Sequence, residues 1–400
     1  MEYEQQVIVA GAGPTGLLNA LGLAQQGLDV TVVERSSEPN DAPRAILYHW
    51  STLDGLERLG LYDDATQAGF LKQDYAHHVR DTGETIHYGL KALEGRVKHP
   101  HNLHLGQGAL ARIILRHLEQ LPNARVLWGH KITGISQDES AVRVAAEHDG
   151  NPVRLRAPWL IGADGAGSAV RNALNLPFEG FTWPERFVAA NIRFPDDRKG
   201  WAQTTFYVDD VLGAIIVKID NSGPHGLWRY TYMEDAVLPE EGVVERLPRF
   251  LEQIFGPEVA AGITLDAIAP YRMHQRSAPT YRVGRVLLAG DAAHATNPTG
   301  GFGLTMGLFD SYVLNEALGA VIAGRAGESV LDAYSELRRS AFIDKASPRA
   351  TANKRLIFHS SDPVQRDGDL ELFRRMGNDP DLAAEVLFFT KTLETPSLVH

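Results

Sequence analysis

Residues 7–16, VIVAGAGPTG, decide the fold of this chain. The first four form a continuous apolar run, which is typical of a strand buried on both faces of a parallel sheet. The next six have the spacing G-x-G-x-x-G, and residues 17–26 continue at helical spacing. A second β-branched run, residues 30–33, ends at Glu34. The sequence therefore predicts a strand–helix–strand unit of the Rossmann type at its start.

The glycines of this segment have separate physical tasks. Gly11 makes the tight turn, Gly13 lets the backbone approach a pyrophosphate, and Gly16 lets the helix pack on the strand. The helix N-terminus supplies amide donors to the pyrophosphate, and Glu34, 23 residues after Gly11, can accept hydrogen bonds from a ribose. This motif predicts a dinucleotide site, and by itself it leaves FAD and NAD open.

A second constellation favours FAD. Gly290 and Asp291 follow a buried run at 286–289, and Pro298 and a glycine-rich stretch at 300–303 precede a predicted helix. A carboxylate at a strand end beside a helix N-terminus suits a polyol chain and a ring that becomes negative on reduction. A nicotinamide enzyme has no evident use for this second site.

The length of 400 residues predicts two or three structural units. After residue 178 the sequence pattern changes to four β-rich stretches separated by turn residues, at 186–194, 202–208, 212–218 and 226–233. The pattern of a buried strand returns at 285, and further helices are predicted near 329–343 and 370–393. We expect an α/β fold: a Rossmann-like first part (1–178), an inserted mixed β-sheet substrate domain (179–280), a second part of the first domain (281–345) and a helical C-terminal segment (346–400).

The composition excludes several classes of function. Acidic residues outnumber Lys and Arg by 50 to 39, a net charge of −11 that argues against a nucleic-acid partner. The absence of Cys removes disulfides, thiolate metal sites and dithiol redox chemistry, so any oxidoreductase here must borrow its electron carrier. The 15 His show no metal-ligand spacing. No apolar run reaches the ~18 residues of a membrane span, and we expect a cytoplasmic protein.

A third motif, Gly162–Gly165 followed by Ser168 and Arg171, completes the pattern. The three motifs in this order resemble the single-component (group A) FAD-dependent aromatic hydroxylases of the 4-hydroxybenzoate hydroxylase family, over residues 5–345. Three further segments, 271–276 (YRMHQR), 292–298 (AAHATNP) and 347–353 (SPRATAN), are similar to the para-nitrophenol 4-monooxygenase subgroup.

This resemblance implies a GR2-type FAD-binding domain and a set of cofactor contacts. The residues it assigns to FAD are Gly11, Ala12, Gly13, Pro14, Thr15, Gly16, Glu34, Arg35, Arg44, Ala45, Gln107, Ile132, Asp164, Gly165, Gly290, Asp291, Pro298, Gly300, Gly301, Phe302, Gly303 and Leu304. Phe302 and Thr305 stand where Gln and Asn are common in the family, and Ser311 where Ala is common.

The resemblance also implies an activity. NAD(P)H, bound transiently, reduces FAD; the reduced flavin and dioxygen form a hydroperoxide that hydroxylates a phenolic ring, with a nitrophenol or similar phenol as the narrower expectation. The inserted sheet would roof the pocket, and the protein would be a monomer or homodimer. The candidates for catalysis are Pro298, His294, His274, Arg272, Tyr207 and Tyr232. A flavin reductase or halogenase and a non-enzymatic flavin-binding module are the alternatives.

Overall fold

The computed structural model describes residues 2–40, 43–194, 201–223 and 225–399. Its first layer is a six-stranded sheet in the order β19-β20-β13-β2-β3-β9, in which the strands from β20 to β9 run parallel. The strands are β19 (Arg282–Val283), β20 (Val286–Leu288), β13 (Trp159–Gly162), β2 (Val7–Ala10), β3 (Val30–Val33) and β9 (Ala124–Leu127). β2, β3, β13 and β20 are fully buried, which explains their unbroken apolar runs. The predicted strand–helix–strand unit is confirmed.

Helices from three parts of the chain pack with this sheet into the main hydrophobic core. They are α1 (Pro14–Ala24), α4 (Gln107–Leu118) and α8 (Phe302–Ile322). Their sequence positions confirm that the nucleotide-binding fold is built from segments on both sides of an insertion. Shorter helices lie nearby: α2 (Leu53–Arg58), α3 (Tyr62–Ala68) and α5 (Ala169–Ala173).

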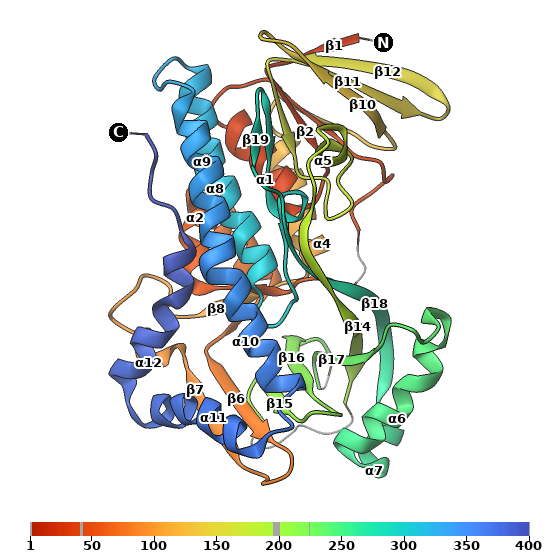
Figure 1. Ribbon diagram of the computed structural model, residues 1–400, viewed down its shortest axis with the longest axis vertical. Helices are drawn as coiled ribbons and strands as arrows, with labels where there is room; N and C mark the ends of the chain where they lie inside the picture. Colours follow the sequence, from red (N-terminus) through yellow and green to blue (C-terminus); the bar gives the residue numbers. More distant parts are fainter. Residues whose placement is uncertain (1, 41–42, 195–200, 224, 400) are drawn as a thin grey trace.

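The second layer is an eight-stranded sheet, in the order β21-β18-β14-β17-β16-β15-β6-β7. Its strands are β21 (His294–Ala295), β18 (Thr264–Ser277), β14 (Glu179–Arg193), β17 (Leu227–Asp235), β16 (Ala214–Asp220), β15 (Thr204–Val208), β6 (Asp74–Val79) and β7 (Thr85–Gly89). The four predicted β-rich stretches correspond to β14 to β17. The long strands β14 and β18 run from the upper half of the molecule into the lower half (Figure 1).

Residues 74–89 join this sheet through parallel pairing of β6 with β15, although they precede the predicted insertion in sequence. Two further sheets are small. One contains β1 (Glu2–Glu4), β12 (Asn151–Ala157), β11 (Val142–His148) and β10 (Lys131–Gln137); the other contains β4 (Leu47–Tyr48), β8 (Asn102–His104) and β5 (Phe70–Lys72). The predicted division at residues 178 and 280 stays a prediction.

The two faces of the eight-stranded sheet have different coverings (Figure 1). On one face, α6 (Val243–Phe255) packs its buried stripe of Leu247, Leu251 and Phe255 on the strands, with α7 (Pro257–Ala261) beside it. On the other face lie α10 (Ser347–Phe358), α11 (Pro363–Asn378) and α12 (Pro380–Leu387). The two faces therefore offer different environments to alternate residues of every strand.

The C-terminal segment is helical as expected, but its elements differ from the prediction. Helix α9 (Ser329–Ser340) continues through a single π-helical segment, Ala341–Ala346, into α10, where the sequence indicated an end near residue 343. The single helix expected over 370–393 is instead α11, α12 and a 3-10 turn, because Pro380 begins a new helix capped by Asp379. No helix among the described residues is long and apolar enough to cross a membrane.

Candidate active site

The first glycine motif forms a backbone cradle at the end of β2. Gly11 has φ +97°, and a Cβ there would lie 2.4 Å from the Ala163 carbonyl oxygen. A Cβ on Gly16 would lie 2.0 Å from the Gly11 carbonyl oxygen. Helix α1 begins at Pro14 after Gly13, with no side chain capping its N-terminus. The first amides of α1 are therefore free of a capping side chain and can bind an anion.

Glu34 lies beside this cradle. Its carboxylate accepts hydrogen bonds from the Ala12 and Ser36 amides, each at 2.8 Å. The turn after β9 hydrogen-bonds to the same segment, since the His130 amide donates to the Glu34 carbonyl at 2.7 Å. Ile132 follows at the start of β10, and Arg35 is exposed beside Glu34. The structure thus brings together the residues predicted to hold the adenosine half of the cofactor.

The second and third motifs pack directly on the first. A Cβ on Gly290, which has φ +59°, would lie 2.7 Å from Thr15 Oγ1. Asp291 follows, and its side chain is exposed to solvent. The protein around its carboxyl group excludes part of the water, and this desolvation raises the pKa of Asp291. Burial also raises the pKa of Asp164, whose carboxylate accepts from Ser168 Oγ and two amides at the start of α5. Asp291 is consequently available to a polyol.

Arg44, Ala45 and Gln107 meet at another wall. The Gln107 amide, at the start of α4, donates to the Ala45 carbonyl at 3.2 Å, and Arg44 beside it is exposed. Gln107 follows Ala45 by 62 positions in the chain, and β4 and β8 bring the two segments together by pairing Leu47 with His104.

A loop at the start of α8 closes the site. Gly300 and Gly301 have φ +105° and +71°, which favour glycine at both positions. The Gly301 amide donates to the Pro298 carbonyl at 3.0 Å, and no side chain caps the helix that begins at Phe302. Gly303 and Leu304 continue that first turn. Two uncapped helix N-termini and a solvent-accessible carboxylate fit the pyrophosphate, the ribityl chain and the ring of FAD.

A cavity of about 110 Å³ lies beyond this loop, between the eight-stranded sheet and the C-terminal helices. Gly300 and Phe302 form one wall, so the cavity begins where the flavin-binding loop ends. The remaining wall is largely apolar and includes six aromatic side chains: Trp50, Tyr75, Tyr88, Phe206, Phe373 and Phe389. A cavity of this size, aromatic and meeting the cofactor loop, suits a single aromatic ring.

Two histidines in the cavity wall are held neutral. Burial lowers the pKa of His49 to about 4, although its Nε2 lies 2.7 Å from the Gly300 carbonyl oxygen. Burial lowers the pKa of His77 to about 3, and its ring packs on Phe206 and Phe373. Nearby, burial lowers the pKa of His104 to about 3.

Acid is expected to destabilise the folded state through these histidines. Between pH 6.5 and about 4 the unfolded chain binds protons that the folded chain excludes, so the free energy of unfolding falls by about 1.4 kcal/mol per pH unit for each such group. His77→Phe keeps the ring contacts and removes one titrating group. The free energy of unfolding of this variant should therefore fall less steeply as the pH decreases, by about 1.4 kcal/mol per pH unit. Urea unfolding of both proteins at pH 7, 6 and 5 measures this; equal slopes would contradict it.

Two predicted catalytic tyrosines lie on the face of the sheet opposite the cavity. Tyr207 lies next to Phe206 in β15, and successive side chains of a strand point to opposite faces. Phe206 lines the cavity, whereas Tyr207 and Tyr232 join the cluster under α6 on the other face. Their ring neighbours there are Trp201 and Phe250. The local sequence pattern predicts the strands, whereas the face that borders the cavity depends on where the C-terminal helices pack.

The other candidates also lie outside the cavity wall. Arg272 is exposed on β18, and His274, on the same strand, has Nδ1 2.9 Å from Thr182 Oγ1. His294 is completely buried, with Nε2 2.7 Å from Asp310 Oδ2 behind the Gly290 turn, so it cannot contact a substrate in this cavity. Pro298 remains at the site, and its contact with the reacting ring stays a prediction.

Sequence reasoning missed the polar residues that do line the cavity. They are His49 after β4, His77 on β6, Arg349 and Asn353 on α10, and Thr390 in the last turn of the chain. Arg349 and Asn353 lie in the segment 347–353 within the predicted helical C-terminus and are four residues apart, a helical spacing, but nothing local indicates that this segment reaches the substrate pocket. His77 gave no signal, because the parallel pairing of β6 with β15 joins distant segments.

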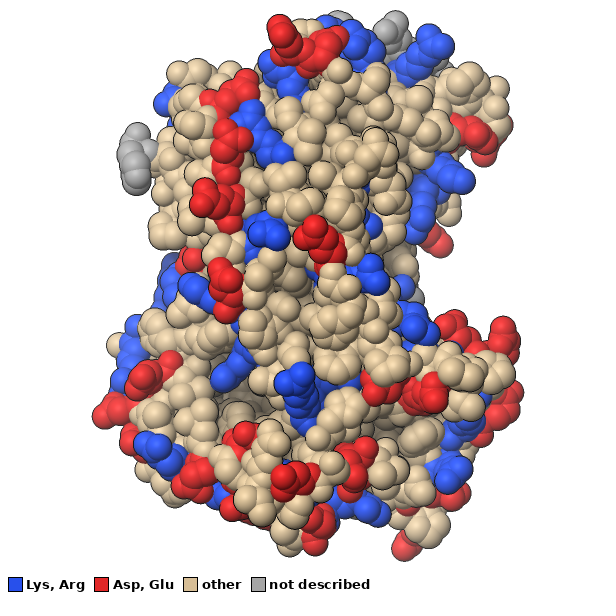
Figure 2. Space-filling view, viewed as in Figure 1, with Lys and Arg blue, Asp and Glu red and all other residues tan. Residues whose placement is uncertain are grey.

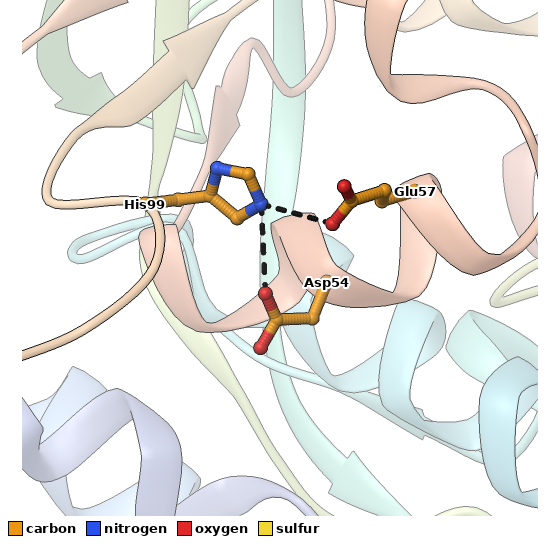
Figure 3. Close-up of side chains that lie close together, drawn as sticks. All are labelled: Asp54, Glu57 and His99. Atoms are coloured by element: carbon orange, nitrogen blue, oxygen red, sulfur yellow. Dashed lines mark hydrogen bonds and ion pairs between the residues drawn. The ribbon is translucent and has the colours of Figure 1, made fainter.

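One group of side chains has metal-like spacing among the described residues. His99 Nε2 lies 3.5 Å from Asp54 Oδ1 and 3.3 Å from Glu57 Oε2 (Figure 3). Lys98 Nζ already lies 2.6 Å from the same Glu57 oxygen. This is an ion-pair cluster with its own cation, and we do not assign it to a metal. Over the face shown in Figure 2, acidic and basic side chains are interspersed.

The fold and the site together define a FAD-dependent aromatic monooxygenase. The chain belongs to the FAD binding domain family, whose model matches residues 4–347. It is 43% identical over 396 residues to 6-hydroxy-3-succinoylpyridine 3-monooxygenase from Pseudomonas putida (strain DSM 28022 / S16), covering 99% of this chain and 100% of that protein. It is 40% identical over 381 residues to para-nitrophenol 4-monooxygenase from Pseudomonas sp. (strain WBC-3), covering 95% and 93%.

A solved structure shares the whole fold. The p-nitrophenol 4-monooxygenase PnpA from Pseudomonas putida DLL-E4 superposes with a TM-score of 0.94 at 39% identity, covering 99% of this chain and 100% of that one. The family resemblance and the FAD monooxygenase class predicted from the sequence are confirmed.

Proposed function

We propose that this enzyme oxygenates a single-ring hydroxyaromatic compound at the carbon para to its hydroxyl group, where a substituent is displaced. The observation that carries this proposal is the aromatic cavity of about 110 Å³ that begins at Gly300 and Phe302. It lies beside the loop that fits the flavin ring, and its walls favour one flat ring.

The relatives support the position of attack. One is named for oxygenating position 3 of a pyridine that carries a hydroxyl at position 6 and a succinoyl group at position 3. The other is named for oxygenating position 4 of a phenol with a nitro group at that position. Both names describe attack para to a hydroxyl group, at the carbon that bears the substituent. We extend this common pattern to the present chain.

The chain's own residues exclude water and fix the ring. When bound and reduced by NAD(P)H, FAD supplies the electrons and activates dioxygen, which is chemistry that no side chain here supplies. Phe206, Tyr75 and Phe373 surround the ring with apolar surface and keep water out. His49 holds the Gly300 carbonyl, so the loop between the ring and the cofactor site keeps one geometry.

A screen of para-substituted phenols and hydroxypyridines tests this function. In the FAD-loaded enzyme, 4-nitrophenol should stimulate oxidation of NADH or NADPH, consume one dioxygen per turnover and release one nitrite, as para attack on the nitro-bearing carbon requires. NAD(P)H oxidation that no member of the screen stimulates would contradict the proposal. Hydroxylation beside the hydroxyl group, with the para substituent retained, would contradict the position of attack.

A matched pair of variants tests which sheet face holds the substrate. Phe206→Ala removes part of the cavity wall and should raise the KM for the phenol about tenfold, which corresponds to a loss of about 1.4 kcal/mol of apolar contact between the half-buried Phe206 and the ring. Tyr207→Phe removes only a hydroxyl on the α6 face and should leave kcat/KM within about twofold. A large loss in Tyr207→Phe with no change in Phe206→Ala would place the substrate on the α6 face.

A further inference from the structure

Four polar side chains line the cavity without a protein hydrogen-bond partner among the described residues. Arg349 and Asn353 lie on one face of α10, His77 is 3% exposed on β6, and Thr390 is 8% exposed near the C-terminus. His77 Nδ1 and Thr390 Oγ1 are buried and unpaired. Buried polar groups in folded proteins are normally paired. Two buried groups, together with the half-buried Arg349 and Asn353, converge on one cavity, which indicates that a ligand supplies the missing partners.

The charge in the cavity has one sign. None of the described residues that line it is a carboxylate, and burial keeps His49 and His77 neutral near pH 7. Arg349 is thus the cation of the site, and no ion pair joins it to a carboxylate within the described part of the chain. Its guanidinium lies 5.2 Å from the ring centroid of Phe389, and burial lowers its pKa.

The course of the C-terminal helices puts Arg349 in this position. The π-helical segment Ala341–Ala346 changes the helical phase between α9 and α10. The residues that α10 then turns to the cavity are Arg349, Asn353, Leu356 and Ile357, one stripe along the helix. Gln275 fixes the first residue of α10 by donating to Ser347 Oγ at 2.7 Å. The guanidinium of Arg349 therefore lies on a helix whose first residue is held by a hydrogen bond from Gln275.

We propose that Arg349 determines substrate specificity by binding the oxygen atoms of an anionic or strongly electron-withdrawing group on the ring, such as a nitro group or the carboxylate of a short side chain. A planar guanidinium matches both groups with two parallel N–H donors. Asn353 and His77 add neutral polar contacts, and the aromatic walls hold the ring. This inference rests on the proposed function, because it takes the cavity to be the substrate site.

Binding measured on the FAD-loaded enzyme tests this role without requiring turnover. The probes are 4-nitrophenol, 4-(4-hydroxyphenyl)-4-oxobutanoate and neutral 4-ethylphenol, and the readout is the change that each causes in the flavin absorbance. Arg349→Gln should weaken binding of the first two about ten- to hundredfold, since a hydrogen bond to a charged group is worth about 1.5–3 kcal/mol, and leave 4-ethylphenol within about twofold. Arg349→Lys should restore part of the lost affinity.

Arg355→Gln is the matched control, because Arg355 is exposed on the same helix and does not line the cavity. It should bind all three probes as the unmodified enzyme does. Equal weakening of all probes in Arg349→Gln, or no weakening of any, would overturn the inference. Selective loss in an enzyme that hydroxylates none of the probes would support Arg349 as the anion-binding residue and contradict the proposed function alone.

Discussion

Gly13→Ala is expected to produce a stable protein that binds FAD weakly. Gly13 has φ −72°, and a Cβ placed on it meets no atom within 4 Å. The folded chain therefore tolerates alanine there. A methyl group at the uncapped start of α1 would instead meet the pyrophosphate, and overpacking by one methyl costs about 1–3 kcal/mol, or about ten- to hundredfold in Kd. Titration of the unmodified and Gly13→Ala apoproteins with FAD, followed by flavin fluorescence, gives the Kd of each protein for FAD.

Gly368→Ala is the control for this substitution. Gly368 lies inside α11, far from the cradle in sequence, and its Cβ position is also open. Alanine there should raise stability by about 0.5–1 kcal/mol, because Gly is the poorer helix former, with no change in FAD affinity. If Gly13→Ala bound FAD as tightly as the unmodified protein, the placement of the pyrophosphate at this turn would be wrong.

Asp310→Asn is expected to lower the free energy of unfolding by about 3–5 kcal/mol, because it breaks a buried ion network. Asp310 is completely buried, with one oxygen 2.8 Å from Arg338 Nε and the other 2.7 Å from His294 Nε2. Burial alone would raise its pKa, but these two partners more than offset that effect and hold it below the usual range. The same carboxylate accepts the Gly290 amide at 2.9 Å, so its loss also loosens the turn that presents Asp291.

Two measurements keep this prediction specific. Asp332→Asn removes a carboxylate that is 71% exposed and 3.1 Å from Arg282, and a surface pair of that kind is worth about 0–1 kcal/mol. A double-mutant cycle with Arg338→Met should show a coupling of about 1–3 kcal/mol, since the two residues share one network. Additive effects of the two substitutions would show that the network is not cooperative.

The fold around the predicted cofactor residues follows from the sequence because its signals are local. Glycine spacing, a buried strand and a carboxylate at its end lie within a few residues of one another, and Gly11, Glu34 and Asp291 occupy the expected surroundings. These positions are governed by backbone geometry, which leaves few alternatives.

The substrate half could not be read in this way. Tyr207 is a candidate because it is a polar residue of the inserted sheet, but the face that holds the cavity is set by α10 to α12, from the far end of the chain. A shift of one residue in a strand reverses the face on which a side chain lies. His77, Arg349 and Thr390 meet only through long-range packing, so no local pattern marked them as one site.

Oxygen-isotope labelling during turnover tests the central claim most directly. The FAD-loaded enzyme, supplied with NAD(P)H, 4-nitrophenol and ¹⁸O₂, should form an oxygenated product with one ¹⁸O atom for each nitrite released and each NAD(P)H oxidised. The second oxygen atom should appear in water. Product oxygen derived from water, or NAD(P)H oxidation that yields hydrogen peroxide with no labelled product from any hydroxyaromatic compound tested, would contradict a monooxygenase acting in this cavity.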